Sequence, residues 1–157
     1  MPRMTSSLVK NTVRRGLREI IDPSPTPAEV ASIWAHFQNA CAYCGQALEL
    51  GSKGAHLDHL VPASKGGVNS ASNRVLSCAS CNEKEKLDRD WRDFLAEKIL
   101  DPTLRRAREV CIENWSNNSR SPETPSALLQ KADELASQVT EAFEQAAKVL
   151  RDLRHSE

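Results

Sequence analysis

Two short stretches, Cys41-Ala42-Tyr43-Cys44 and Cys78-Ala79-Ser80-Cys81, decide the fold of this 157-residue chain. Two residues between cysteines let one turn direct both sulfur atoms at a single ion, and two such turns complete a tetrahedral four-thiolate site. A single pair of this kind is also typical of a redox motif. The alternative to a metal site is that the four cysteines are simply buried thiols. Two pairs in one short segment favour structural Zn²⁺, so we predict a closed zinc site that folds the domain and does not catalyse.

The segment between the cysteine pairs is rich in side chains that hold metal ions or move protons. Asp58 and His59 are adjacent, so in a strand they point to opposite sides and meet different partners. Carboxylate and amide oxygens suit Mg²⁺ or Mn²⁺, and not a thiolate-bound zinc. Read separately, Asp58 is a turn residue, His59 a strand residue and Asn82 a helix cap. Together and in this order, they indicate a second metal site.

This combination resembles the HNH endonucleases, the ββα-metal nucleases. The resemblance covers roughly residues 41–86 and rests on four motifs: C-x-x-C-G, D-H-x-x-P, G-G, and N-x-x-x-x-C-x-x-C-N. The three signature positions of the family correspond to His59, Asn73 and Asn82, and the last is Asn where many members have His. Many members also carry a lysine three residues later, where this chain has Glu85 with lysines on either side.

The resemblance implies an α+β fold, namely a small ββα-metal core stapled by the four-cysteine zinc site and flanked by helical extensions. It implies a metal-dependent endonuclease that hydrolyses DNA phosphodiester bonds. His59 would be the general base, a task that suits an imidazole with an ordinary pKa of about 6.5. Asp58 and Asn82 would hold one catalytic Mg²⁺ or Mn²⁺, and Asn73 would support the loop that positions His59. Candidate phosphate contacts, with solvated surface charge as the alternative, are Arg74, Lys65, Lys84 and Lys86.

Two other functions stay open at this point. The first is a catalytically inactive zinc-knuckle module that binds nucleic acid or a protein. Degenerate family members typically lose the metal-binding Asp or the His, whereas Asp58, His59 and Asn82 all remain here, which favours the enzyme. The second is a toxin-type nuclease delivered to other cells, for which the sequence offers no secretion module.

The rest of the chain predicts helical extensions around the nuclease domain. Residues 1–22 form a basic amphipathic arm, in which Arg14 and Arg15 either contact DNA phosphates or only face water. Residues 26–115 form the nuclease domain with flanking helices, beginning at a capping box on Thr26. A helix opens near Ser80, and another is capped by Thr103. A polar linker covers residues 116–125, and residues 126–155 form an amphipathic helix.

The last helix carries apolar residues in alternating steps of four and three, a heptad pattern called the seam below. The seam is predicted to be a homodimer coiled coil, a docking surface for a partner protein, or a face that folds back on its own domain. Alanine at three of its positions makes the interface shallow. The seam consists of Leu128, Ala132, Leu135, Val139, Ala142, Ala146, Val149 and Leu153.

The charge composition of the chain does not match the predicted DNA-cleaving function. The chain has 21 basic and 21 acidic side chains, a formal net charge of zero, whereas DNA-binding proteins usually carry a basic surplus. Read by segment, the N-terminal arm is basic and the last helix is acidic, which suggests a weak non-specific grip on DNA. No membrane span or secretory signal is evident, and the cysteines fit metal binding better than disulfides. We therefore expect a cytoplasmic protein of prokaryotic or phage type.

Overall fold

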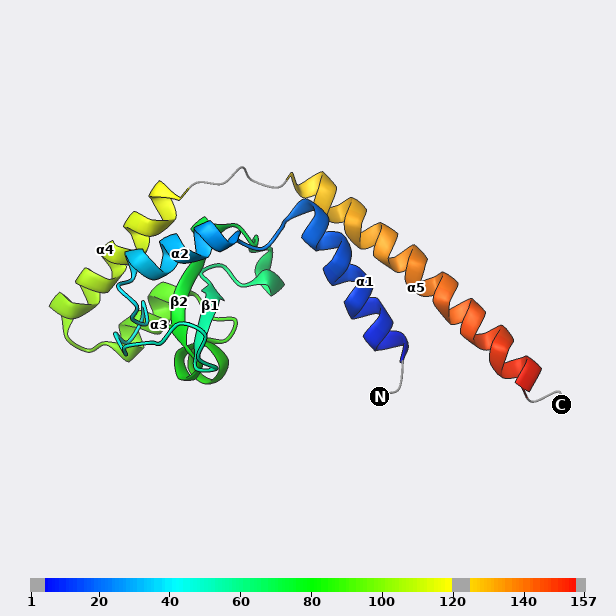
Figure 1. Cartoon of the computed structure of the whole chain (residues 1–157), viewed down its shortest axis with the longest axis horizontal. Coiled ribbons are helices and arrows are strands. Elements are labelled where there is room, and N and C mark those ends of the chain that lie inside the picture. Colours follow the sequence, from blue (N-terminus) through cyan, green and yellow to red (C-terminus); the bar gives the residue numbers. More distant parts are fainter. Residues whose placement is uncertain (1–4, 120–124, 155–157) are drawn as a thin grey trace. The chain divides into compact units, whose positions relative to one another are not determined.

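The computed structural model describes residues 5–119 and 125–154. The chain divides into two compact units, one of residues 24–123 and one that combines residues 1–23 with 124–157, and each is described by itself. Figure 1 shows the helices and strands of both units along the chain. None of the described helices is long and apolar enough to cross a membrane.

The centre of the first unit is a two-stranded antiparallel sheet followed by a helix. Strand β1 (Ala55–His59) pairs with β2 (Arg74–Cys78), and the helix η3 (Ser80–Lys86) follows directly. In the register, His59 lies opposite Arg74 at one end, and Ala55 lies opposite Cys78 at the other. The sheet therefore separates the cysteine end from the histidine end by one strand length. This ββα order confirms the predicted α+β core.

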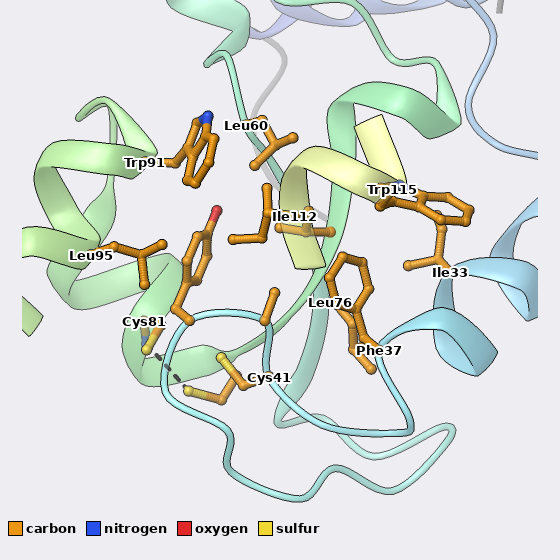
Figure 2. Close-up of a cluster of buried hydrophobic side chains, with 14 of the residues drawn as sticks. Ile33, Phe37, Cys41, Leu60, Leu76, Cys81, Trp91, Leu95, Ile112 and Trp115 are labelled. Atoms are coloured by element: carbon orange, nitrogen blue, oxygen red, sulfur yellow. Dashed lines mark hydrogen bonds between the residues drawn. The ribbon is translucent and has the colours of Figure 1, made fainter. Parts of the chain in front are cut away.

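Three α-helices cover this core. Helix α2 (Pro27–His36) begins at the predicted capping box, in which the Thr26 hydroxyl accepts from the Glu29 N–H and the Glu29 carboxylate accepts from the Thr26 N–H. Helices α3 (Trp91–Lys98) and α4 (Pro102–Asn118) complete the layer. Apolar side chains from all three pack around β2 (Figure 2). The labelled members of this core are Ile33, Phe37, Cys41, Leu60, Leu76, Cys81, Trp91, Leu95, Ile112 and Trp115.

Helix boundaries differ from the sequence prediction in two places. The cap of α4 is Asp101 and not Thr103, because the Asp101 carboxylate accepts from the N–H groups of Thr103 and Leu104, at 2.8 and 3.2 Å. Pro102 at the first helical position lacks an N–H that would need a partner, which favours this earlier start. Helix α4 also runs through Asn118, so residues 116–118 of the predicted linker are helical.

The second unit is a pair of helices, α1 (Ser6–Ile21) and α5 (Ser126–Arg154), which pack against each other. Arg14 and Arg18 of α1 both bind the Asp133 carboxylate of α5, at 3.0 and 3.2 Å. The residues of α5 that this packing buries are Ala132, Ala136 and Thr140. The last helix thus packs on the N-terminal arm, and the buried stripe is mostly not the predicted seam, of which only Ala132 is buried.

Candidate functional site

The four predicted cysteines come together at one end of the sheet. Their Sγ atoms all lie within 4.8 Å of one another, and the Cys44 and Cys78 sulfurs are 3.8 Å apart. A Zn–S bond of about 2.3 Å gives a sulfur tetrahedron with an edge of about 3.8 Å, so the spacing fits a zinc ion. The cluster meets the donor set and geometry of a closed structural zinc site.

The thiols of this cluster also need a cation on electrostatic grounds. A hydrogen bond from Cys81 lowers the pKa of Cys41 to about 4. The hydrogen bond to Cys41 and burial then raise the pKa of Cys81 far above its ordinary value, and burial raises that of Cys44 to about 11. Four thiolates so close together require a bound cation to stay ionised together.

The backbone holds both cysteine turns against the sheet. In the first turn the Ala42 N–H donates to the Leu76 carbonyl at 2.8 Å, which ties it to β2. In the second turn the Cys81 N–H points at the Cys78 sulfur at 3.5 Å. Cys111 is separate from the cluster, half-buried on α4 with its sulfur 3.6 Å from His36 Nε2. It is partly buried and packs against the hydrophobic core.

At the other end of the sheet, His59 is held by a short hydrogen-bond chain. Its Nε2 lies 3.0 Å from Asn69 Oδ1, and the same oxygen accepts from Arg74 Nη2 at 2.6 Å. Arg74 Nη1 donates in turn to the Leu57 carbonyl at 3.1 Å. An amide oxygen only accepts, so Nε2 carries the proton and Nδ1 carries the lone pair.

The surroundings of His59 favour its neutral form. Burial lowers its pKa below the ordinary 6.5, and the positive charge of Arg74 lowers it further, against an opposing contribution from the Asn69 hydrogen bond. The side chain is only half-buried, so it remains in reach of solvent. At neutral pH this residue is therefore a neutral imidazole with a defined tautomer.

Asp58 points to the opposite side of β1, into the core. Its Oδ2 accepts from the Tyr43 hydroxyl at 2.7 Å and binds the Lys86 ammonium at 3.1 Å. Lys86 also donates to the His59 carbonyl at 2.8 Å and is fully buried. Burial and the Asp58 carboxylate raise the pKa of Tyr43, which keeps its hydroxyl a donor. The opposite orientations of Asp58 and His59 are those predicted from their adjacency.

Asn73 ties down the loop that follows His59. Its Oδ1 accepts from the Val61 N–H, and its Nδ2 donates to the carbonyls of Val61 and Val68, at 2.8 to 3.0 Å. The loop fits so closely that a Cβ on Gly67 would lie 1.8 Å from the Val61 carbonyl oxygen. Asn73 therefore contacts the loop backbone, which is the geometry of a supporting residue.

The second predicted metal site has donors of the right kind. Both contacts of Asp58 go to Oδ2, so Oδ1 is the carboxylate oxygen to consider as a ligand for Mg²⁺ or Mn²⁺. Asn82 is half-buried on η3, a π-helix with about 4.4 residues per turn. Residues four apart on such a helix share a face, so Asn82 shares one with Lys86, which contacts Asp58. Asp58 Oδ1 and the Asn82 amide are therefore oxygen donors of the kind that a hard divalent ion prefers, and the Lys86 ammonium holds the same carboxylate through Oδ2.

The predicted phosphate contacts fall into different environments. Lys65 and Lys84 are exposed, and Arg74 is half-buried beside His59. The prediction that Lys86 contacts a phosphate is wrong, because this side chain is fully buried against Asp58. His56 Nε2 lies 3.2 Å from the Lys53 carbonyl oxygen and 3.5 Å from a Glu83 carboxylate oxygen.

Sequence reasoning gave no role to two residues that contact the site. Asn69 fixes the His59 tautomer, and Tyr43 donates to Asp58. The sequence signal for Tyr43 was its place inside the first cysteine turn, since that turn must pack on the sheet. Asn69 had the weaker signal of a polar residue two positions after Gly67 in a loop next to a strand end.

Comparison with known families agrees with this geometry. Residues 41–87 match the family model HNH endonuclease. No curated protein matches the chain. The matched segment contains both cysteine turns, β1, β2 and η3, so the ββα unit with its four-cysteine cluster is an HNH domain. This domain supports a nucleic-acid-related function of the nuclease family.

Proposed function

We propose that this protein is a metal-dependent endonuclease that hydrolyses DNA phosphodiester bonds. The observation that carries the proposal is the state of His59, which is neutral, half-exposed and oriented by Asn69 with Nδ1 available as a base. Nδ1 accepts the proton of a water molecule as that water attacks the phosphorus and the bond from phosphorus to the 3′ oxygen breaks. The leaving 3′ oxygen takes a proton from solvent, so the products are a 5′ phosphate and a 3′ hydroxyl. Nε2 remains protonated throughout and donates a hydrogen bond to Asn69 Oδ1. The same oxygen stabilises the imidazolium that forms when Nδ1 takes up the proton.

The remaining residues of the site would neutralise the charge of the phosphate or hold other site residues in position. A divalent ion held by Asp58 Oδ1 and Asn82 would supply positive charge at the scissile phosphate. Tyr43 and Lys86 fix the Asp58 carboxylate from its other oxygen. Asn73 holds the loop that follows His59. Lys65, Lys84 and Arg74 are the proposed phosphate contacts.

Cleavage of supercoiled plasmid in Mg²⁺ or Mn²⁺ tests this proposal. His59→Ala should lower the nicking rate by at least about a hundredfold, since general-base catalysis contributes roughly 10²–10⁴. His56→Ala, a histidine on the same strand but paired with Lys53 and Glu83, is the matched control and should cleave like the wild type. A chelator should stop both active proteins. Cleavage by His59→Ala at the wild-type rate would contradict the proposal.

One observation favours a second candidate, a zinc-stapled module that binds nucleic acid or protein without cleaving it. The Lys86 ammonium already lies 3.1 Å from Asp58, at the carboxylate that the catalytic ion would use. If this ion pair replaces the metal, the zinc-loaded chain should bind no Mn²⁺ in titration calorimetry and cleave nothing. Binding of one Mn²⁺ that Asp58→Asn removes would support the enzyme.

A further inference from the structure

The seam on α5 is exposed although its residues are apolar. Leu135 and Val139 are 39% and 48% exposed, and Val149 and Leu153 are 57% and 60% exposed. Helix α1 covers a neighbouring stripe that is centred on Ala136 and Thr140. The helix therefore has a second apolar stripe, nearly four heptads long, that packing within the unit leaves exposed except at Ala132. Such a stripe is typical of an interface.

We propose that this surface binds the α5 helix of a second copy of the chain in antiparallel orientation. The sequence is complementary to itself about a two-fold axis beside Thr140 and Glu141, as a symmetric dimer requires. In this register each layer joins a residue of one copy to its counterpart in the other. The layers are Leu128 with Leu153, Ala132 with Val149, Leu135 with Ala146, and Val139 with Ala142.

The sizes of the paired residues support this register. Every alanine of the seam meets Leu or Val of the second copy, so the volumes of successive layers stay similar. In the layer of Ala132 and Val149, α1 already buries Ala132, so Val149, which is 57% exposed, supplies the exposed apolar surface. A parallel dimer would instead stack Ala132, Ala142 and Ala146 on themselves and leave three thin layers. Antiparallel pairing is therefore the better-packed arrangement.

The charged residues that flank the seam also favour the antiparallel register. In the antiparallel register, Lys131 faces Asp152 of the second copy, and Gln138 faces Gln145. Lys131 lies on the surface, where its pair with Glu134 is solvent-exposed, so it is free to reorient toward the second copy at little cost. Self-complementary charge explains why the occupant is a second copy and not an unrelated partner.

Light scattering of the full chain over a concentration series tests the dimer. The wild type should approach twice its monomer mass, and Val139→Asp should stay monomeric because it places a charge in a central layer of both copies. Gln130→Asp, on the exposed face of α5 outside the seam, should dimerise like the wild type. Unchanged far-UV circular dichroism shows that the variants are folded. A monomeric wild type, or a dimeric Val139→Asp, overturns the proposal.

A charge swap tests the orientation. Lys131→Glu or Asp152→Lys alone should weaken the dimer about two- to thirtyfold, because each places like charges opposite one another at two symmetric positions. The double variant Lys131→Glu with Asp152→Lys should restore the wild-type dissociation constant. In a parallel dimer these residues do not face each other, so failure of the double variant to recover overturns the antiparallel register.

Discussion

In the proposed mechanism His59 acts through the ring nitrogen that lacks a proton, and the hydrogen bond to Asn69 determines which nitrogen that is. Arg74 donates to the same amide oxygen, so a flipped Asn69 would place its NH₂ group against two donors. The orientation of Asn69 is therefore fixed by its neighbours, and so is the tautomer of His59. In the proposed mechanism Asn69 is a positioning residue, because it would act on the base and not on the substrate.

Changes at Asn69 should move the His59 pKa in opposite directions. Asn69→Asp adds a negative charge beside the ring and should raise the pKa, and Asn69→Ala removes a hydrogen bond that raises it and should lower it further. Imidazole NMR titrations of the zinc-loaded chain without Mg²⁺ measure both shifts, with the His56 resonance as internal control. A wild-type His59 pKa above 6.5 would contradict the structure.

The lowered His59 pKa also has a consequence for stability. Between pH 6.5 and the folded-state pKa, the unfolded chain binds a proton that the folded chain excludes. The contribution of this residue to folding is therefore complete above pH 6.5 and is lost as the pH falls through the folded-state pKa. Asn69→Asp should reduce this loss.

Lys86 is the residue whose removal should cost the most stability among the lysines of η3. Its ammonium is fully buried and neutralises Asp58, so Lys86→Met leaves a buried carboxylate with Tyr43 as its donor. Breaking a buried pair costs about 3–5 kcal/mol in the free energy of unfolding. Lys84→Met, on the exposed face of the same helix, should change it by less than about 0.5 kcal/mol. Urea denaturation of the zinc-loaded variants measures both, and equal effects would mean that Lys86 is not buried in solution.

At the scale of elements, an ion bound by the four cysteines would join the first cysteine turn to the second, which follows β2. Structural zinc contributes about 10–16 kcal/mol at neutral pH, which is more than the usual stability of a domain. Cys78→Ser should therefore lose zinc and the cooperative thermal transition of the nuclease unit. Cys111→Ser should keep one zinc per chain, because that thiol lies outside the cluster. Zinc content by atomic absorption and melting by circular dichroism give the result, which a normally melting, zinc-free Cys78→Ser would contradict.

Elements that depend on local chemistry were predictable from the sequence, and those that depend on packing were not. The cysteine spacing fixed the metal cluster, and the capping box on Thr26 fixed the start of α2. The burial of Lys86 could not be foreseen, because it depends on the three-dimensional contact between η3 and Asp58 of β1. Periodicity identified α5 as amphipathic, but the helix has two apolar stripes, and only three-dimensional packing selects the one that meets α1.

For the whole molecule, the structure shows how some of the balanced positive and negative side chains pair with one another. The basic arm is partly neutralised by its own chain, since Arg14 and Arg18 are both bound by Asp133 of the acidic α5. Positive charge toward DNA would then come from the lysines near the site and from the bound cation. We therefore expect weak non-specific binding to DNA, for which the proposed dimer would compensate by presenting two HNH domains to one DNA molecule.

Neutralising Asp133 should therefore strengthen DNA binding if α1 lies along the DNA backbone. Asp133→Asn and Glu134→Gln each remove one negative charge, but only the first releases two arginines of α1. The Asp133 ion pairs are partly buried, but Asn and Gln keep the shape of the side chains that they replace, so both variants should keep the helix pair intact. Each phosphate that an arginine newly contacts steepens the salt dependence of log K by about 0.9, so Asp133→Asn should add about one to two to the slope. Fluorescence anisotropy with duplex DNA between about 50 and 200 mM salt measures the slope. Identical slopes for the two variants would show that Arg14 and Arg18 serve the helix pair alone, and that the nuclease unit binds DNA without α1.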